Sequence, residues 1–136
     1  KYDEMGRDYN PLGCVDKDGE EIVPLKYKLG FFGPDVVCVQ SKEYKYGMYD
    51  LKGKEITPCI YDHIDFFYGN YTIVRQNGKF GVMNNRGEIV VPVQYDQIKP
   101  FYEHYGNWGT DKYKFEVVFC LSKGGKMSVI NISRDL

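Results

Sequence analysis

The chain repeats itself every 34 residues, and this repeat constrains the fold more than any other feature of the sequence. Three copies begin at Gly13, Gly47 and Gly81. In each copy a second glycine follows after six residues, a proline after eleven and a tyrosine after fourteen, which gives the columns Gly19, Gly53 and Gly87; Pro24, Pro58 and Pro92; and Tyr27, Tyr61 and Tyr95. A partial fourth copy begins 47 residues after Gly81, with Ser128 in the glycine column. A period of this length is typical of proteins built from stacked supersecondary units.

Each copy has the turn signals of short antiparallel strands. Asn77-Gly78 lies between two apolar runs and predicts a two-residue hairpin, because both central residues of a type I′ turn need positive φ. Asn84 and Gly87 predict the next turn, with the Asn84 side chain capping its own backbone and Gly87 in the left-handed conformation. Gly124-Gly125 predicts a third hairpin turn near the end of the chain.

The proline and tyrosine columns predict how one copy leads to the next. Pro92 cannot donate to a strand ladder, so we expect it to end its strand. Tyr95 and Ile98 are then expected to pack as a buried bridge to the next copy. This gives three strands per copy.

Composition agrees with an all-β fold. The chain lacks alanine, the best helix former, and aromatic residues make up 16% of its 136 residues. We expect one domain over 1–136, with units at 1–35, 36–69, 70–103 and, in part, 117–136, and an insertion at 99–116. The predicted fold is a continuous meander of short antiparallel hairpins and three-stranded units, curled or barrel-like, with an open solenoid-like stack as the alternative. Residues 1–12 would cap one end, and the insertion with the terminal hairpin the other.

Charge and cysteine patterns exclude several classes of function. The net charge of −1 gives no strong field for nucleic acid, and no apolar run approaches the length of roughly 20 residues that a transmembrane helix needs. The four cysteines have no C-x-x-C spacing, and each histidine is separated from any cysteine by several residues. We therefore expect free thiols, with no metal site and no cofactor.

Residues 77–98, with the sequence NGKFGVMNNRGEIVVPVQYDQI, resemble the bacterial WG repeat, whose consensus is approximately G-K-W-G-x-I-D-x-x-G-x-x-V-I-P-x-x-Y-D-x-I. The resemblance covers three units plus a partial fourth, although the tryptophan column holds Leu12, Tyr46, Phe80 and Met127. The literal Trp108-Gly109 pair belongs to the insertion. The resemblance implies a β-rich bacterial interaction module without shared catalytic residues or cofactor. It leaves a cytoplasmic and an exported location both open.

The carboxylates of the repeat give no reason to expect an enzyme. Asp62 and Asp96 occupy the same column after the tyrosine, which favours a turn element over a catalytic pair. The sequence also contains no G-x-S-x-G elbow and no glycine-rich phosphate loop. We therefore expect a noncatalytic protein.

The insertion at 99–116 concentrates aromatic residues and contains the candidate binding residues Phe101, Tyr102, Tyr105, Trp108 and Tyr113. Insertions in repeat proteins often carry binding, and tyrosine and tryptophan suit protein interfaces and sugar platforms alike. The other interpretation is a cap that packs on the end of its own sheet. The expected function is binding of another protein, with binding of a glycan or the cell envelope as the alternative.

Overall fold

The computed structural model describes residues 12–106, 109 and 114–136, and for residues 29, 103–105 and 114–115 it describes the backbone alone. Every regular element in this part of the chain is a β-strand. The strands are β1 (Leu12–Val15), β2 (Glu21–Tyr27), β3 (Leu29–Gly33), β4 (Val36–Gln40), β5 (Tyr46–Asp50), β6 (Glu55–Tyr61), β7 (His63–Ile64), β8 (Tyr71–Gln76), β9 (Lys79–Asn84), β10 (Ile89–Tyr95), β11 (Gln97–Tyr105), β12 (Lys114–Lys123) and β13 (Lys126–Asn131). The all-β prediction is confirmed.

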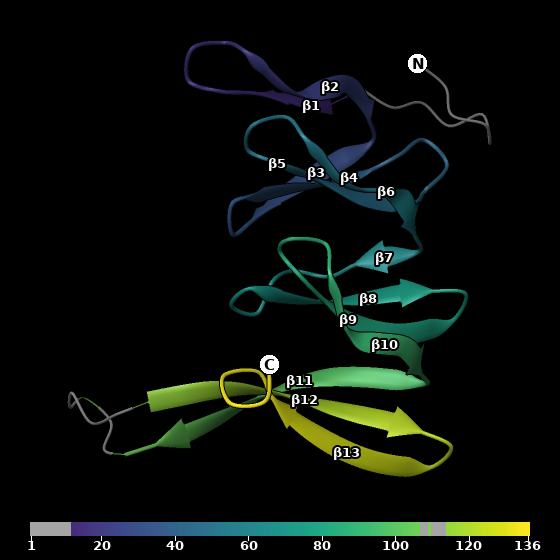
Figure 1. The fold of residues 1–136 in the computed structure, drawn as a ribbon, viewed down its shortest axis with the longest axis vertical. Helices are drawn as coiled ribbons and strands as arrows, with labels where there is room; N and C mark the ends of the chain where they lie inside the picture. Colours follow the sequence, from purple (N-terminus) through teal and green to yellow (C-terminus); the bar gives the residue numbers. More distant parts are fainter. Residues whose placement is uncertain (1–11, 107–108, 110–113) are drawn as a thin grey trace.

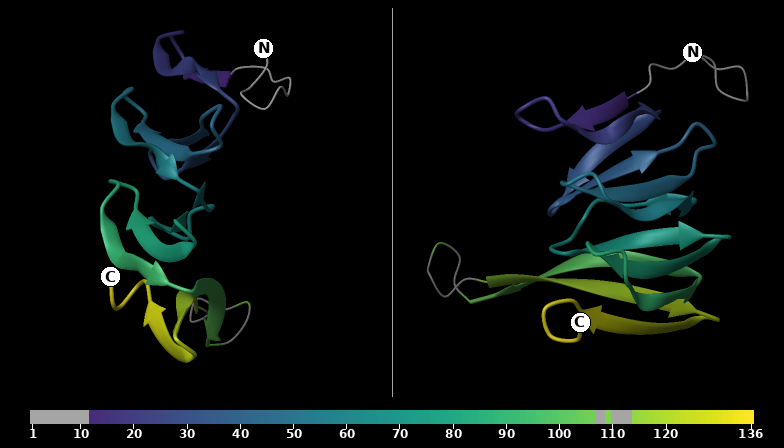
Figure 2. Two further views of the ribbon diagram at one scale, coloured as in Figure 1. Left: turned by 90° about the vertical axis from the view of Figure 1, so that its right-hand side faces the viewer. Right: turned by 45° about the horizontal axis from the view of Figure 1, so that its top comes forward.

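The strands form antiparallel sheets that follow the chain order and lie on top of one another (Figure 1). The sheets are β1–β2, β3–β4–β5–β6, β7–β8–β9–β10 and β11–β12–β13. One residue separates the last strand of each sheet from the first strand of the next, so the meander is interrupted at Lys28, Asp62 and Asp96. The described strands therefore stay open and do not close into a barrel, as the views in Figure 2 also show.

Each full repeat contains four strands, and the prediction of three was wrong. The segment after the tyrosine column, expected only as a buried bridge, forms the first strand of the next sheet, which is β7 after Tyr61 and β11 after Tyr95. Ile64 and Ile98 in these strands are indeed buried. The tyrosine therefore marks the border between two sheets.

The proline column does not end its strand, which corrects a second expectation. Pro58 lies inside β6 and Pro92 inside β10, at places where the pairing register with the preceding strand shifts. This bulge explains the glycine column. A Cβ on Gly47 would lie 2.8 Å from the Thr57 carbonyl oxygen, and one on Gly81 would lie 2.7 Å from the Val91 carbonyl oxygen. The glycine and the proline therefore act together: the bulged strand that carries the proline lies so close to the glycine that no side chain fits at the glycine position.

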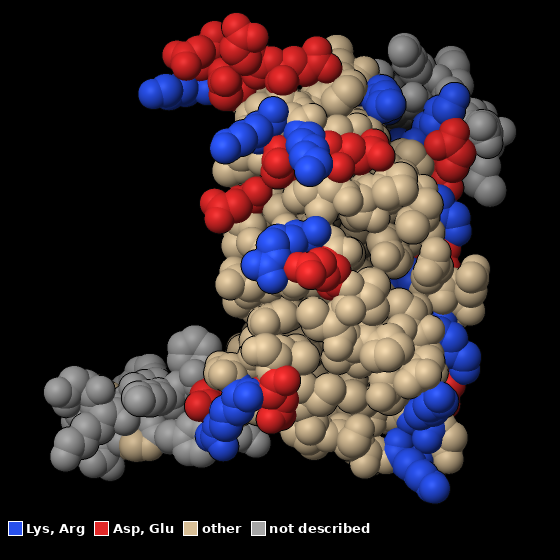
Figure 3. Space-filling view, in the orientation of Figure 1, with Lys and Arg blue, Asp and Glu red and all other residues tan. Residues whose placement is uncertain are grey.

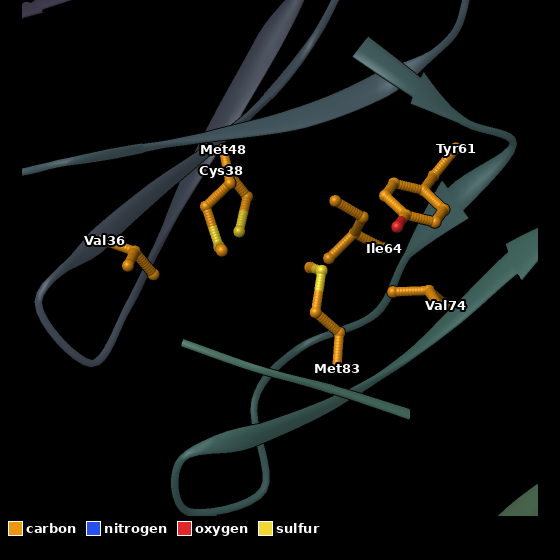
Figure 4. Packing of buried hydrophobic residues seen from close by; sticks show 7 residues of the cluster. All are labelled: Val36, Cys38, Met48, Tyr61, Ile64, Val74 and Met83. Atoms are coloured by element: carbon orange, nitrogen blue, oxygen red, sulfur yellow. The ribbon is translucent and has the colours of Figure 1, made fainter. Parts of the chain in front are cut away.

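The two residues after each repeat glycine point to opposite sides of the sheet and hold the stack together. The first residue faces the following sheet, as Met48 and Val82 do, and the second faces the preceding sheet, as Tyr49 and Met83 do. Between the sheets β3–β6 and β7–β10 this alternation builds an apolar core, which Figure 4 shows; its buried members are Val36, Cys38, Met48, Tyr61, Ile64, Val74 and Met83. Adjacent repeats therefore bury each other's apolar faces.

The predicted turns are confirmed. Asn77 and Gly78 have φ of 54° and 77° and join β8 to β9. The Asn84 side-chain oxygen accepts hydrogen bonds from the backbone N–H of Arg86 and Glu88 at 2.9 and 3.0 Å, and Gly87 has φ of 81°. Gly124 and Gly125 likewise have positive φ between β12 and β13.

The insertion lengthens one hairpin. β11 and β12 pair without a break from Gln97 opposite Ser122 to Tyr105 opposite Lys114, so much of 99–116 is strand rather than loop. This arm projects beyond the outline of the other sheets (Figure 2). No helix that could cross a membrane occurs in the described residues.

Candidate functional site

The sheet β11–β12–β13 is the last sheet of the described stack, and no other described sheet covers one of its faces (Figure 1). Its inner face contributes Ile98, Phe119 and Leu121 to the core shared with β7–β10. We call the opposite face the end face and define it by Gln97, Lys99, Phe101, Cys120, Met127 and Val129, which alternate with the inward-facing residues. A hollow of about 230 Å³ lies on it, lined by Gln97, Lys99, Phe101, Cys120, Ser122 and Met127.

The end face exposes a repeat column that is fully buried in the second and third copies. Met48 and Val82 follow the repeat glycine and are both 0% exposed, because the next sheet covers them. Val129 occupies the same column in the fourth copy and is 61% exposed. Its neighbour Met127 is 73% exposed, and Phe101 is 52% exposed. Exposed apolar side chains that lie together mark a surface suited to contact with another molecule or another part of a chain.

The five predicted binding residues are not brought together as one patch. Phe101 lies on the end face, whereas Tyr102 lies on the other face of β11 with its ring 6.5 Å from that of Tyr68. Tyr102 is nonetheless 54% exposed. Tyr105 belongs to β11, but its side chain is not among the described groups, and Trp108 and Tyr113 lie outside the described residues.

Asp62 and Asp96 act as clamps between hairpins rather than as a carboxylate pair. Asp62 forms an ion pair with Lys45 and accepts the Asn77 backbone N–H at 2.9 Å. Asp96 forms an ion pair with Lys79 at 2.5 Å and accepts the Gly124 backbone N–H at 3.0 Å. The hydrogen bond from the lysine lowers the pKa of each carboxyl group. Both carboxyl groups therefore stay ionised. Each links a lysine beside the hairpin turn of one sheet to the hairpin turn of the next sheet.

The thiols of the described cysteines are free. Burial raises the pKa of the Cys38 thiol to about 12, and burial also raises the pKa of Cys59. These environments oppose the formation of a reactive thiolate. Among the described residues no group of three or more His, Cys, Asp or Glu side chains is placed to hold a metal ion.

Charged side chains of both signs gather along the two sides of the molecule, where the hairpin turns lie, and leave a broad uncharged band between them (Figure 3). In that view acidic side chains gather at the top, over the β1–β2 hairpin, whereas the charged groups lower in the stack are of both signs. Sequence reasoning missed Met127 and Val129, which it treated only as repeat positions. The signal that could have found them is the column itself, because Val129 aligns with Met48 and Val82.

Comparison with known protein families identifies the repeat. The family model described as WG containing repeat matches residues 13–29, 46–80 and 80–105, and these matches cover more than half of the chain. Neither a curated protein nor a solved structure matches.

Proposed function

The chain belongs to the family of WG-containing repeats, and from this premise we propose that it is a noncatalytic repeat module that binds another protein through its end face. The observation that carries the proposal is the contrast within one repeat column. Met48 and Val82 are fully buried by a neighbouring sheet, whereas Val129 remains mostly exposed. The surface that joins repeats inside the chain is thus available for joining the chain to a partner.

The composition of the end face supports a protein partner. Phe101, Met127 and Val129 supply apolar area, and methionine adapts to partners of different shape. Lys99 and Gln97 border the same hollow and supply polar contacts. An apolar centre with a polar border is the usual anatomy of a protein interface.

Affinity capture with matched variants tests this proposal. The double variant Met127→Lys, Val129→Lys places two charges on the end face without altering a buried position, and is expected to lose the captured partner. The control Leu25→Lys makes the same kind of change at another exposed strand position, 71% exposed in β2, and is expected to retain it. Circular dichroism and thermal melts confirm that all three proteins are folded. A partner that binds all three equally, or no captured partner at all, would contradict binding at the end face.

A second candidate function is binding of a glycan or the cell envelope. The observation that favours it is the exposed Phe101 ring beside Lys99 and Gln97, since an aromatic platform with polar neighbours suits a sugar. A glycan array with the wild-type chain and Phe101→Ser tests it. Binding that depends on Phe101 supports this candidate, and an array without signal removes it.

A further inference from the structure

The net charge of −1 conceals a separation of charge between the two ends of the strands. Neighbouring strands are antiparallel, so every second connection lies at the same side of the stack. One side holds the hairpin turns β4–β5, β8–β9 and β12–β13 and the junctions between sheets. We call it the lysine edge and define it by residues 26–28, 40–46, 61–63, 75–79, 95–96 and 122–126. It carries eight Lys or Arg residues against three Asp or Glu residues, an excess of five positive charges.

The opposite ends of the strands carry the reverse balance. We call this side the turn edge and define it by residues 15–21, 33–36, 50–55, 65–70, 84–89 and 131–136. It carries ten Asp or Glu residues against five Lys or Arg residues, an excess of five negative charges. Figure 3 shows Lys and Arg side chains along its right-hand side, where the lysine edge lies, and an acidic group at the upper left. The two excesses cancel in the net charge but not at either edge.

The carboxylates of the lysine edge are already engaged within the chain. Asp62 and Asp96 each pair with a lysine of the preceding sheet, and each accepts a backbone N–H from the hairpin turn of the following sheet. The third carboxylate, Glu43, lies 3.9 Å from Lys42. The two clamps therefore hold the three hairpin turns in fixed positions relative to one another, and they leave the other cations of this edge without a carboxylate to balance them.

The unbalanced cations form a row that crosses three sheets. Lys42 lies in the β4–β5 turn, Arg75 lies beside the β8–β9 turn, and Lys123 and Lys126 flank the β12–β13 turn; all four are exposed. In the part of the chain that the structure describes, no ion pair joins Arg75, Lys123 or Lys126 to a carboxylate. Sheets that pack face to face lie about 10 Å apart, and an extended polypeptide rises about 3.3 Å per residue. A carboxylate at every third position of an extended segment therefore matches the step of this row.

The aromatic rings of this edge favour a polypeptide over a nucleic acid. Proteins that bind a single nucleic-acid strand combine cations with open aromatic rings on which the bases stack. Here the ring of Tyr44 is covered by the Lys28 Nζ at 4.5 Å, and the ring of Tyr46 packs against His63 with the ring centres 5.1 Å apart. Arginine, whose planar fork suits phosphate, accounts for one of the eight cations, and lysine accounts for the other seven.

We propose that the lysine edge binds an extended acidic polypeptide segment, whose carboxylates pair with the cations of successive hairpin turns along the stack. Charge complementarity selects this partner, because the edge has an excess of five positive charges that the chain itself does not balance. A single exposed ion pair contributes little, so binding depends on several sheets acting together and weakens as salt is added. The surface is separate from the end face, and the proposal goes beyond the proposed function without depending on it.

The first test measures fluorescence anisotropy of a fluorescein-labelled peptide built from repeated Glu-Ser-Gly units, which carries a carboxylate at every third position. The variant Lys42→Gln, Arg75→Gln, Lys123→Gln removes one cation from each of the three hairpin turns and spares both clamps. It is expected to bind the peptide about 3- to 100-fold more weakly than the wild type, because three exposed ion pairs are lost. Added salt should weaken the wild type more steeply than this variant.

The matched control removes the same number of cations from the turn edge. The variant Lys17→Gln, Lys52→Gln, Lys54→Gln has the same net charge as the first variant, and its three positions are also exposed. It is expected to bind the peptide like the wild type, and circular dichroism checks that both variants are folded. A wild type that does not bind the peptide, or equal losses in the two variants, would overturn the proposal.

Zero-length cross-linking locates the bound peptide on the wild-type chain and needs no variant. A carbodiimide condenses a lysine amine with a carboxylate that touches it, and mass spectrometry identifies the lysine that is joined. Coupling of the peptide is expected on the lysine edge, at Lys42, Lys123 and Lys126. Coupling that is equally frequent on the lysines of the turn edge, or confined to them, would overturn the proposal.

A labelled oligothymidylate of matched length, measured in the same assay, tests for a nucleic acid. Weaker binding of the oligothymidylate than of the acidic peptide supports the proposal. Tighter binding of the oligothymidylate, lost on Lys42→Gln, Arg75→Gln, Lys123→Gln, would overturn it and assign the lysine edge to nucleic acid. The capture experiment with Met127→Lys, Val129→Lys changes the end face alone, so the proposed function and this proposal fail separately.

Discussion

Replacing Gly47 with alanine should destabilise the fold through the backbone of the neighbouring strand. An ideal Cβ at Gly47 lies 2.8 Å from the Thr57 oxygen, 2.9 Å from the Cys59 nitrogen and 2.9 Å from the Pro58 carbonyl carbon. These are backbone atoms of β6 and cannot rotate away, so β5 and β6 must separate by roughly half an ångström to restore ordinary contact. Such overpacking typically costs about 1–3 kcal/mol. For a chain of this length that corresponds to a fall in Tm of about 3–12 °C.

Two controls isolate the cause of that loss. Gly30→Ala also introduces a methyl group within a strand, but its closest contact is the Cys38 oxygen at 3.3 Å, so a smaller loss is expected. Ser128→Ala alters the same repeat column where no bulged strand lies over it, and its free energy of unfolding should change by less than about 0.5 kcal/mol. Chemical denaturation of the three variants provides the measurement. If Gly47→Ala were as stable as the wild type, the coupling between glycine and the proline bulge would be refuted.

The remaining predictions concern the turns, the clamps and a buried thiol. Asn84→Ala removes the acceptor of two backbone N–H groups and should cost about 1–3 kcal/mol in denaturant unfolding, whereas Asn84→Asp keeps that acceptor and should cost far less; equal losses would contradict the capping role. The Asp96 pKa is lowered by Lys79, so the stabilisation is complete above the unfolded pKa of about 3.9 and is lost as the pH falls through the folded pKa. The Tm should therefore fall as the pH drops below about 4, and it should fall less steeply for Asp96→Asn than for the wild type. Identical pH profiles of Tm for the two proteins would exclude the clamp. Cys38 should resist alkylation until the chain unfolds, and rapid labelling of the native protein would contradict its burial.

The repeat and its turns could be predicted from the sequence because their signals are local. Asn77-Gly78 and Asn84 with Gly87 adopt the predicted conformations, since these residues satisfy the backbone by themselves. The same column of turn residues in the other copies, Asp16 and Asp50, makes the same two backbone contacts. Periodicity and turn chemistry were therefore sufficient for the all-β class and the antiparallel pairing.

The proline column was misread because its role depends on a partner strand. A proline alone predicts the end of a strand, but Pro58 and Pro92 lie in bulges whose cost is offset by a facing glycine. The pairing of glycine and proline columns appears only when two strands are placed side by side. The same limitation hid the short strand β7, since its two residues give no period to detect.

Two departures of the first copy from the repeat are explained by one contact. Lys28 stands where the later copies have Asp62 and Asp96, and Tyr44 stands near the tip of the following hairpin, where a later copy has Asn77-Gly78. The Lys28 Nζ lies 4.5 Å from the centre of the Tyr44 ring. A cation–π contact thus occupies the place of the carboxylate clamp. The sequence gives no local signal that connects these two residues, because 16 positions separate them.

The candidate site was foreseen only in part. Phe101 and Tyr102 were predicted as candidate binding residues, with a cap on their own sheet as the other interpretation, and both are more than half exposed. The strand alternation of β11 places them on opposite faces, which an interpretation of 99–116 as a loop could not anticipate. Met127 and Val129 became candidates only when the structure showed that no described sheet covers them.

Hydrogen exchange of the chain with and without its captured protein partner tests the central claim most directly. Backbone amides differ in exchange according to local opening and coverage, so a bound partner leaves a footprint on the strands that it covers. Binding at the end face predicts added protection in β11 and β13, with β4 and β5 unchanged. Protection confined to other sheets, or no change in β11 and β13 while the partner is bound, would contradict the account.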